Sequence, residues 1–156
     1  MPERIAVVGV SSGEPVGKEA RAAVEAATVV AGAPRHLRTL APLGARTLPI
    51  DGPLTDVLDA IERERGGVCV LASGDPGFFG IVRVLAERFG PERLDVHPAP
   101  SAVSLAFARL GLPWDDAAVI SAHGRPLADA ARRAVRHQKA AVLVAPDAPP
   151  EALGRE

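Results

Sequence analysis

The sequence contains several short runs of consecutive apolar residues, each followed by a loop and an amphipathic helical pattern. The clearest runs are 5–10 (Ile-Ala-Val-Val-Gly-Val) and 67–72 (Gly-Val-Cys-Val-Leu-Ala). A strand without in-and-out alternation is typical of a sheet that is covered on both faces. Because these strands alternate with helices, the sequence predicts an α/β fold with a mostly parallel sheet, flanking helices and right-handed crossovers.

The order of the elements follows from the same patterns. We expect strands at 5–10, 28–31, 46–50, 67–72 and 94–97, and helices at 17–27, 36–40, 53–65, 81–89 and 100–110. The segment 111–116 (Gly-Leu-Pro-Trp-Asp-Asp) breaks this rhythm and is predicted to be a linker. Residues 1–110 are therefore assigned to an N-terminal α/β lobe and 117–156 to the start of a second α/β lobe.

The predicted second lobe holds strands at 117–121 and 140–145 and one helix at 127–136. Two strands and one helix cannot enclose a core of their own. These elements therefore either extend the first sheet or begin an incomplete second lobe.

Composition excludes several classes of protein. The 156 residues carry a net charge of −1 with acids and bases interspersed, which gives no electrostatic footprint for nucleic acid or an anionic membrane. No apolar stretch approaches the roughly 20 residues of a membrane span, and the run 5–10 is too short for a signal peptide. We expect a soluble, cytoplasmic protein. Its single cysteine, Cys69, lies in an apolar run and is expected in the core.

The loop 72–80 (Ala-Ser-Gly-Asp-Pro-Gly-Phe-Phe-Gly) joins a predicted strand to a predicted helix. In open α/β sheets, ligands bind at the carboxyl ends of the strands. Gly74 and Gly77 allow a ligand to approach the backbone closely, and Asp75 offers a hydrogen-bond acceptor for ribose hydroxyls or an amino group. The alternative is an ordinary turn in which Asp75 caps its own backbone.

Other candidate sites give weaker signals. The first loop, 9–15, does not match the dinucleotide pattern Gly-x-Gly-x-x-Gly, which disfavours a nucleotide or NAD site. The four histidines are scattered, and none has the spacing of a metal ligand. His123 lies in a site-like loop beside Arg125. Arg35, Arg38 and Arg125 are candidates for bidentate binding of substrate carboxylates. A solvated surface position is the alternative for each of these arginines.

Taken in order, these segments resemble the tetrapyrrole methylases. The segment 73–81 is similar to that family's Gly-Asp-Pro loop, and 98–104 followed by 110–114 is similar to its next characteristic segment. The segments 29–37 and 120–125 (Ile-Ser-Ala-His-Gly-Arg) resemble one branch of the family. That branch comprises the precorrin-6Y C(5,15)-methyltransferases and their cobalt-precorrin-7 counterparts.

The resemblance implies an S-adenosylmethionine-dependent methyltransferase of cobalamin biosynthesis, a two-lobed α/β homodimer that binds the cofactor between its lobes and a precorrin as substrate. The cofactor contacts that it implies are Ser12, Gly74, Asp75, Pro76, Phe78, Ser101 and Ala102. The candidate substrate contacts are Arg35, His123 and Arg125. No catalytic acid or base and no metal ligand is expected, because transfer from an activated sulfonium mainly needs alignment and exclusion of water.

The sequence departs from the family's pattern in two places. The first loop of the family is usually Gly-x-Gly-Pro-Gly, whereas this chain has Gly9-Val10-Ser11-Ser12-Gly13. Family domains also run to roughly 200 residues, so the second lobe is expected to be truncated. Two alternatives therefore stay open: a non-catalytic α/β module that only dimerises, and a nucleotide-dependent α/β enzyme.

Overall fold

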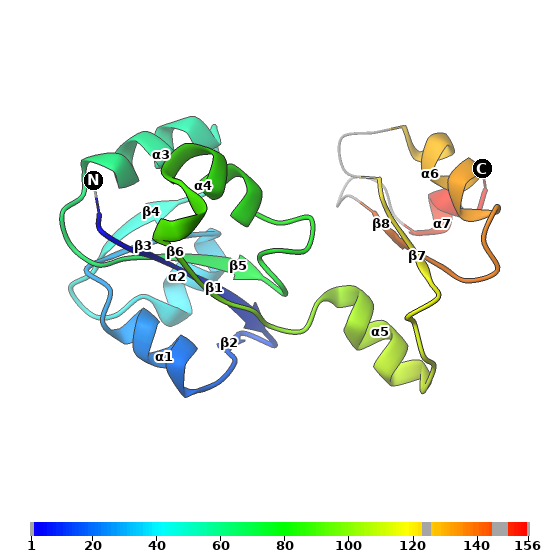
Figure 1. Ribbon diagram of the computed structural model, residues 1–156, viewed down its shortest axis with the longest axis horizontal. Coiled ribbons are helices and arrows are strands. Elements are labelled where there is room, and N and C mark those ends of the chain that lie inside the picture. The colour runs from blue at the N-terminus through cyan, green and yellow to red at the C-terminus, as the bar shows by residue number, and fades with distance from the viewer. Residues whose placement is uncertain (1, 123–125, 145–149, 156) are drawn as a thin grey trace. The chain divides into compact units, whose positions relative to one another are not determined.

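The computed structural model describes residues 2–122, 126–144 and 150–155. They fall into two compact units, divided after Ser101 (Figure 1). The first unit holds a six-stranded sheet and the second a two-stranded sheet. No helix within the described ranges is long and apolar enough to cross a membrane.

The sheet of the first unit is mostly parallel, as predicted. Its order is β2-β1-β5-β3-β4, with β6 also paired to β1. Only β2 runs antiparallel to its neighbour. The chain therefore inserts β5 between two strands that precede it in the sequence. The bounds are β1 Ile5–Ser11, β2 Glu14–Pro15, β3 Val29–Gly32, β4 Arg46–Pro49, β5 Val68–Ser73 and β6 Leu94–His97.

Helices cover both faces of this sheet (Figure 1). One face carries α1 (Lys18–Glu25) and α2 (Pro34–Leu40), and the other carries α3 (Leu54–Arg63) and α4 (Val82–Phe89). In β5, Val68 and Val70 join the core under α3 and α4, whereas Cys69 and Leu71 join the core under α1 and α2. Burial on both faces explains why the strand is apolar at every one of these positions.

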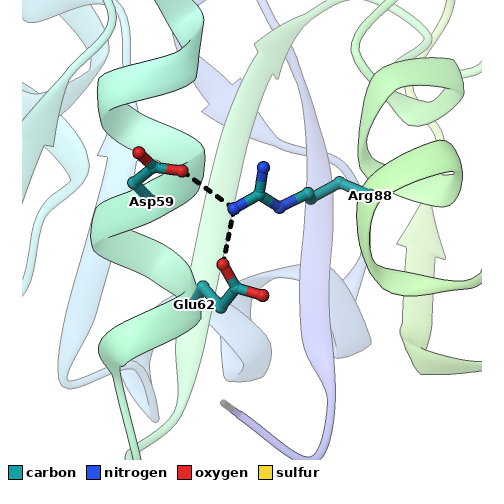
Figure 2. Close-up of polar contacts among 3 residues, drawn as sticks. All are labelled: Asp59, Glu62 and Arg88. Carbon is teal, nitrogen blue, oxygen red and sulfur yellow. Dashed lines mark hydrogen bonds and ion pairs between the residues drawn. The ribbon is translucent and has the colours of Figure 1, made fainter.

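An ion-pair cluster links the two helices of one face. Figure 2 shows Arg88 of α4 between Asp59 and Glu62 of α3, with its Nη2 at 2.8 Å and 2.5 Å from their carboxylate oxygens. Because all three side chains are exposed, the cluster contributes modestly and is sensitive to salt. It adds to the apolar core that α3 and α4 share.

The second unit is built from α5 (Ala102–Leu110), β7 (Ala118–Ser121), α6 (Leu127–Ala134), β8 (Ala140–Leu143) and α7 (Pro150–Leu153). Strands β7 and β8 are parallel. Their small core consists of Ile120, Ala122 and Ala130, with partly buried neighbours such as Val142.

The division between the units differs from the boundary that the sequence suggested. We expected helix 100–110 in the first lobe and a linker at 111–116, but α5 groups with the second unit. One reason is that Phe107 of α5 stacks on Trp114, with ring centroids 6.2 Å apart and an interplanar angle of 11°. The expected linker thus lies inside the second unit.

The predicted helices and strands are all present among the described residues, with ends shifted by a few residues. Helix α1 begins at Lys18 rather than Gly17, because Gly17 has a φ of 93° that no helix accommodates. Three short elements were not predicted: β2, a 3₁₀ turn at Pro91–Arg93, and α7.

Candidate functional site

The topology of the first unit marks one position at the carboxyl edge of the sheet. Strands β1 and β5 are parallel neighbours, yet β1 leads to α1 on one face and β5 leads to α4 on the other. In open α/β sheets, a crevice opens between strands whose following helices diverge in this way. The loops that leave β1 and β5 therefore flank the expected ligand position.

Two loops approach strand β1 closely at this edge. A Cβ atom on Gly9 would lie 2.3 Å from the carbonyl oxygen of Gly74 and 2.5 Å from the amide nitrogen of Ala99. The amide of Gly74 donates to the carbonyl of Val10 at 2.8 Å. Only glycine fits at position 9, and its absent side chain lets the loops after β5 and β6 pack against β1.

The Gly-Asp-Pro loop is held by its own hydrogen bonds. Asp75 Oδ1 accepts a hydrogen bond from the amide of Gly77 at 2.8 Å, as in the turn that the sequence left open as an alternative. The ring of Pro76 is fully buried, and its carbonyl accepts from the amide of Val82 at 3.1 Å. Asp75 thus stabilises the turn through one of its two carboxylate oxygens. Pro76 anchors the loop through its buried ring and through the hydrogen bond that its carbonyl accepts.

Two aromatic side chains, Phe78 and Phe79, lie near the end of this loop. Phe78 is half-buried and meets Phe79 edge to face, with ring centroids 5.0 Å apart. Phe79 is 56% exposed and has a φ of 52°, which is uncommon for a bulky residue. We did not single out Phe79 from the sequence; its signal was a second aromatic residue in a glycine-rich loop.

A polar cluster lies beside the start of the loop. Arg35 Nη2 donates to Ser73 Oγ at 2.8 Å, and His36 Nε2 lies 2.9 Å from the same oxygen. His36 is buried, and this burial, together with the charge of Arg35, lowers the pKa of its imidazole below 6.5. At neutral pH the imidazole is therefore uncharged while the guanidinium beside it is charged.

This cluster brings one predicted substrate contact, Arg35, next to the predicted cofactor loop. The sequence analysis included Ser73 in the candidate loop 72–80 without giving it a role, and it did not single out His36. Their signal was positional, because β3 and β5 are parallel neighbours, Ser73 is the last residue of β5, and His36 lies in the helix that follows β3.

The remaining predicted contacts are more dispersed. Ser12 is exposed at the tip of the β1–β2 hairpin, where Ser12 and Gly13 both have positive φ, as a two-residue type I′ turn requires. Ser101 is buried after β6, at the end of the first unit, and Ala102 is exposed at the start of α5 in the second unit. His123 and Arg125 lie outside the described residues.

The charged groups of this edge, one carboxylate and one guanidinium, suit the binding of a ligand. Beside them lie backbone groups, aromatic surface, the hydroxyl of Ser73 and the uncharged imidazole of His36. In the part of the chain that the structure describes, no group of three or more His, Cys, Asp or Glu side chains could hold a metal ion. Such a set of groups suits a nucleoside-like ligand and a second small molecule that carries carboxylates.

Comparison with known proteins gives a consistent set of relatives. Residues 4–154 match the family model described as tetrapyrrole (corrin/porphyrin) methylases. A precorrin-6Y C(5,15)-methyltransferase [decarboxylating] from Sinorhizobium sp. is 41% identical over 114 residues, which are 72% of this chain and 28% of the relative. A cobalt-precorrin-7 C(5)-methyltransferase from Salmonella typhimurium is 32% identical over 135 residues, which are 86% of this chain and 66% of the relative. The chain thus spans less than two thirds of the length of either relative.

Solved structures agree with the sequence relatives. A cobalamin-biosynthesis precorrin-6Y methylase from Archaeoglobus fulgidus superimposes with a TM-score of 0.71 at 26% identity, covering 98% of this chain and 78% of that one. A cobalt precorrin-4 methyltransferase shares the fold at 22% identity with a TM-score of 0.61. These structures confirm the predicted α/β architecture.

Proposed function

The chain belongs to the tetrapyrrole methylase family, and from that premise we propose that it takes part in S-adenosylmethionine-dependent C-methylation of a precorrin of the precorrin-6Y type. The pathway that this proposal assigns is cobalamin biosynthesis. The names of the two sequence relatives support it. The observation that carries it is the meeting of the Gly-Asp-Pro loop with Gly9 and Ala99 at the divergence of β1 and β5.

The residues at this edge fit the proposed cofactor. S-adenosylmethionine presents ribose hydroxyls and an amino group, which need acceptors, and a nucleoside body, which needs close backbone approach. Gly74 leaves room for that approach, and the carboxylate of Asp75 is fixed by Gly77 before any ligand binds. A group that is already oriented loses less entropy on binding. We assign the second carboxylate oxygen of Asp75 to the ligand.

The other proposed cofactor contacts come from neighbouring segments. Phe78 supplies apolar surface, and the buried ring of Pro76 acts by stiffening the loop. The resemblance to the family also implies Ser12, Ser101 and Ala102, and they stay part of the proposal.

On the substrate side, we assign Arg35 to a peripheral carboxylate of the tetrapyrrole. Its guanidinium is exposed, while Ser73 holds it through Nη2. Guanidinium binds carboxylates through two parallel hydrogen bonds, which orients the ring as well as attracting it. His123 and Arg125 are further proposed contacts. Bound S-adenosylmethionine supplies the methyl group as an activated sulfonium, and the chain's residues align the two partners and exclude water.

Calorimetry with S-adenosylhomocysteine tests the cofactor assignment. Asp75→Asn keeps an oxygen for the amide of Gly77 but replaces the second acceptor with a donor, whereas Asp75→Ala removes both. We expect both variants to weaken binding about tenfold or more, since a hydrogen bond to a charged group contributes roughly 1.5–3 kcal/mol. The control is Asp51→Asn, at an exposed aspartate after β4, which is expected to bind as the unchanged chain does. Unchanged affinity in Asp75→Ala would show that the cofactor assignment is wrong.

The resemblance also implies a homodimer, and the sequence pattern predicts a location in the cytoplasm; both stay part of the proposal. Analytical ultracentrifugation tests the assembly, and cell fractionation tests the location. The rival function is a module that only dimerises. A dimer whose melting temperature does not rise with S-adenosylhomocysteine would favour that rival.

A further inference from the structure

Ser73 lies between two side chains of α2. Arg35 Nη2 donates to Ser73 Oγ at 2.8 Å, and His36 Nε2 is 2.9 Å from the same oxygen. Arginine has no acceptor, so Ser73 Oγ must accept in the first contact. The hydroxyl hydrogen can then point to His36 Nε2 when that nitrogen carries no proton. One lone pair of Ser73 Oγ stays open in this arrangement.

Ser73 and His36 differ in solvent exposure. Ser73 is exposed at the end of β5, directly before the Gly-Asp-Pro loop, whereas His36 is only 8% exposed. Burial first, and then the charge of Arg35, lower the pKa of the His36 imidazole, so the ring is neutral at pH 7 and has one acceptor nitrogen. An exposed hydroxyl backed by a neutral imidazole is the arrangement that moves a proton away from a bound ligand.

Resting on the proposed methylation, we propose that Ser73 and His36 form a relay that takes up the proton released when the ring carbon is methylated. Transfer forms a bond from the ring carbon to the methyl group and breaks the bond from that methyl group to sulfur, whose electron pair stays on sulfur. The methylated ring gains one positive charge and returns to neutrality by losing a proton. That proton goes to Ser73 Oγ while the hydroxyl proton moves to His36 Nε2.

The environment also accounts for the return of the relay to its starting state. Both burial and the charge of Arg35 disfavour the imidazolium form of His36. The imidazolium therefore passes its proton through Ser73 to solvent once the product has left. In this scheme Ser73 faces the substrate, and His36 is a positioning residue that acts through Ser73.

Nuclear magnetic resonance of the ring nitrogens tests the pair without any ligand. In the unchanged chain at pH 7.5, we expect the ¹⁵N shifts of His36 to show an unprotonated Nε2 and a protonated Nδ1. Ser73→Ala removes the donor to Nε2, so the Nε2 resonance should shift while that of His137, exposed in the second unit, stays in place. A protonated Nε2 at this pH would overturn the relay.

Single-turnover methyl transfer from S-adenosylmethionine to precorrin-6Y, measured against pH, tests the role in the reaction. We expect the rate of the unchanged chain to fall as the pH falls through a pKa below 6.5. Ser73→Ala and His36→Gln should lose this inflection and about 100-fold of the rate, the lower end of general-base contributions. Their affinity for S-adenosylhomocysteine should stay within about twofold. His137→Gln is the control and should keep both rate and profile.

The outcomes separate this inference from the proposed function. If the unchanged chain methylates and Ser73→Ala keeps the rate and the inflection, the relay is overturned and the proposed function stands. If the unchanged chain neither binds S-adenosylhomocysteine nor methylates, the proposed function fails and the relay fails with it. Ser73→Ala is the decisive variant, because Ser73 is exposed whereas the His36 substitution changes a buried position.

Discussion

Replacing Gly9 with alanine should push the loops after β5 and β6 away from strand β1 at the carboxyl edge of the sheet. The new Cβ would lie 2.3 Å from the Gly74 carbonyl oxygen, against an ordinary contact distance of about 3.5 Å, so the backbone must move by about 1 Å. Overpacking a well-packed site costs typically about 1–3 kcal/mol. The upper part of that range is expected, because both nearest atoms belong to backbone that cannot rotate away.

Urea unfolding followed by circular dichroism measures this cost, and the matched control is Gly52→Ala. A Cβ atom on Gly52 meets nothing within 4 Å and its φ is not in the left-handed region, so this variant should stay within about 0.5 kcal/mol of the unchanged chain. For a unit of this size, each kcal/mol corresponds to about 4–8 °C in melting temperature. Gly9→Ala should also weaken S-adenosylhomocysteine in calorimetry, because the displaced loop carries Asp75.

Equal stability of the Gly9 and Gly52 variants would refute the reasoning, because it would mean that the loops do not approach as closely as the distances state. If Gly9→Ala lowers the stability but leaves the affinity for S-adenosylhomocysteine unchanged, only the predicted effect on binding would be refuted. In that case the close approach would serve the fold and not the binding of the cofactor.

Three further predictions concern titration and salt. The unfolded chain binds the His36 proton more tightly than the folded chain, so the stability that the neutral ring contributes is complete above about pH 6.5 and is lost as the pH falls below it. Denaturant unfolding between pH 5 and 8 should show this slope, and His36→Gln should flatten it. Burial raises the pKa of the Cys69 thiol from 9.0 to about 12, so a thiol reagent at pH 8 should label the chain only after unfolding, and stability should decline as the pH rises above 9. Arg88→Ala should lower the melting temperature at low ionic strength, and the difference should shrink in 1 M salt; a difference that persists in salt would mean that packing and not charge joins α3 to α4.

The central part of the fold follows from the sequence because its strands are buried on both faces. Val68 to Leu71 alternate between two cores, so every position is apolar and the run stands out. The hairpin strand β2 does not stand out, since two residues have no periodicity to detect. The place of α5 depends on a contact between Phe107 and Trp114 that spacing alone does not predict.

The candidate site was only partly predictable for a similar reason. The Gly-Asp-Pro loop and Arg35 were identified from local sequence, and the structure places both at one edge. The partnership of Ser73 with His36 depends on β5 lying next to β3, which is a property of strand order and not of either segment. For Asp75, the turn and the proposed ligand role are compatible, because the turn uses Oδ1 and leaves the second carboxylate oxygen for the ligand that we propose.

The position of β5 also has a consequence for synthesis on the ribosome. Strands β1 and β3 emerge early, but each pairs with β5 and not with the other. Until residues 68–73 have left the exit tunnel, both strands expose unpaired backbone groups along the edge that pairs with β5. Pairings between distant segments form slowly, and open strand edges are where growing chains aggregate. We therefore expect nascent chains that stop before β5 to bind chaperones, and those that extend past it to be released.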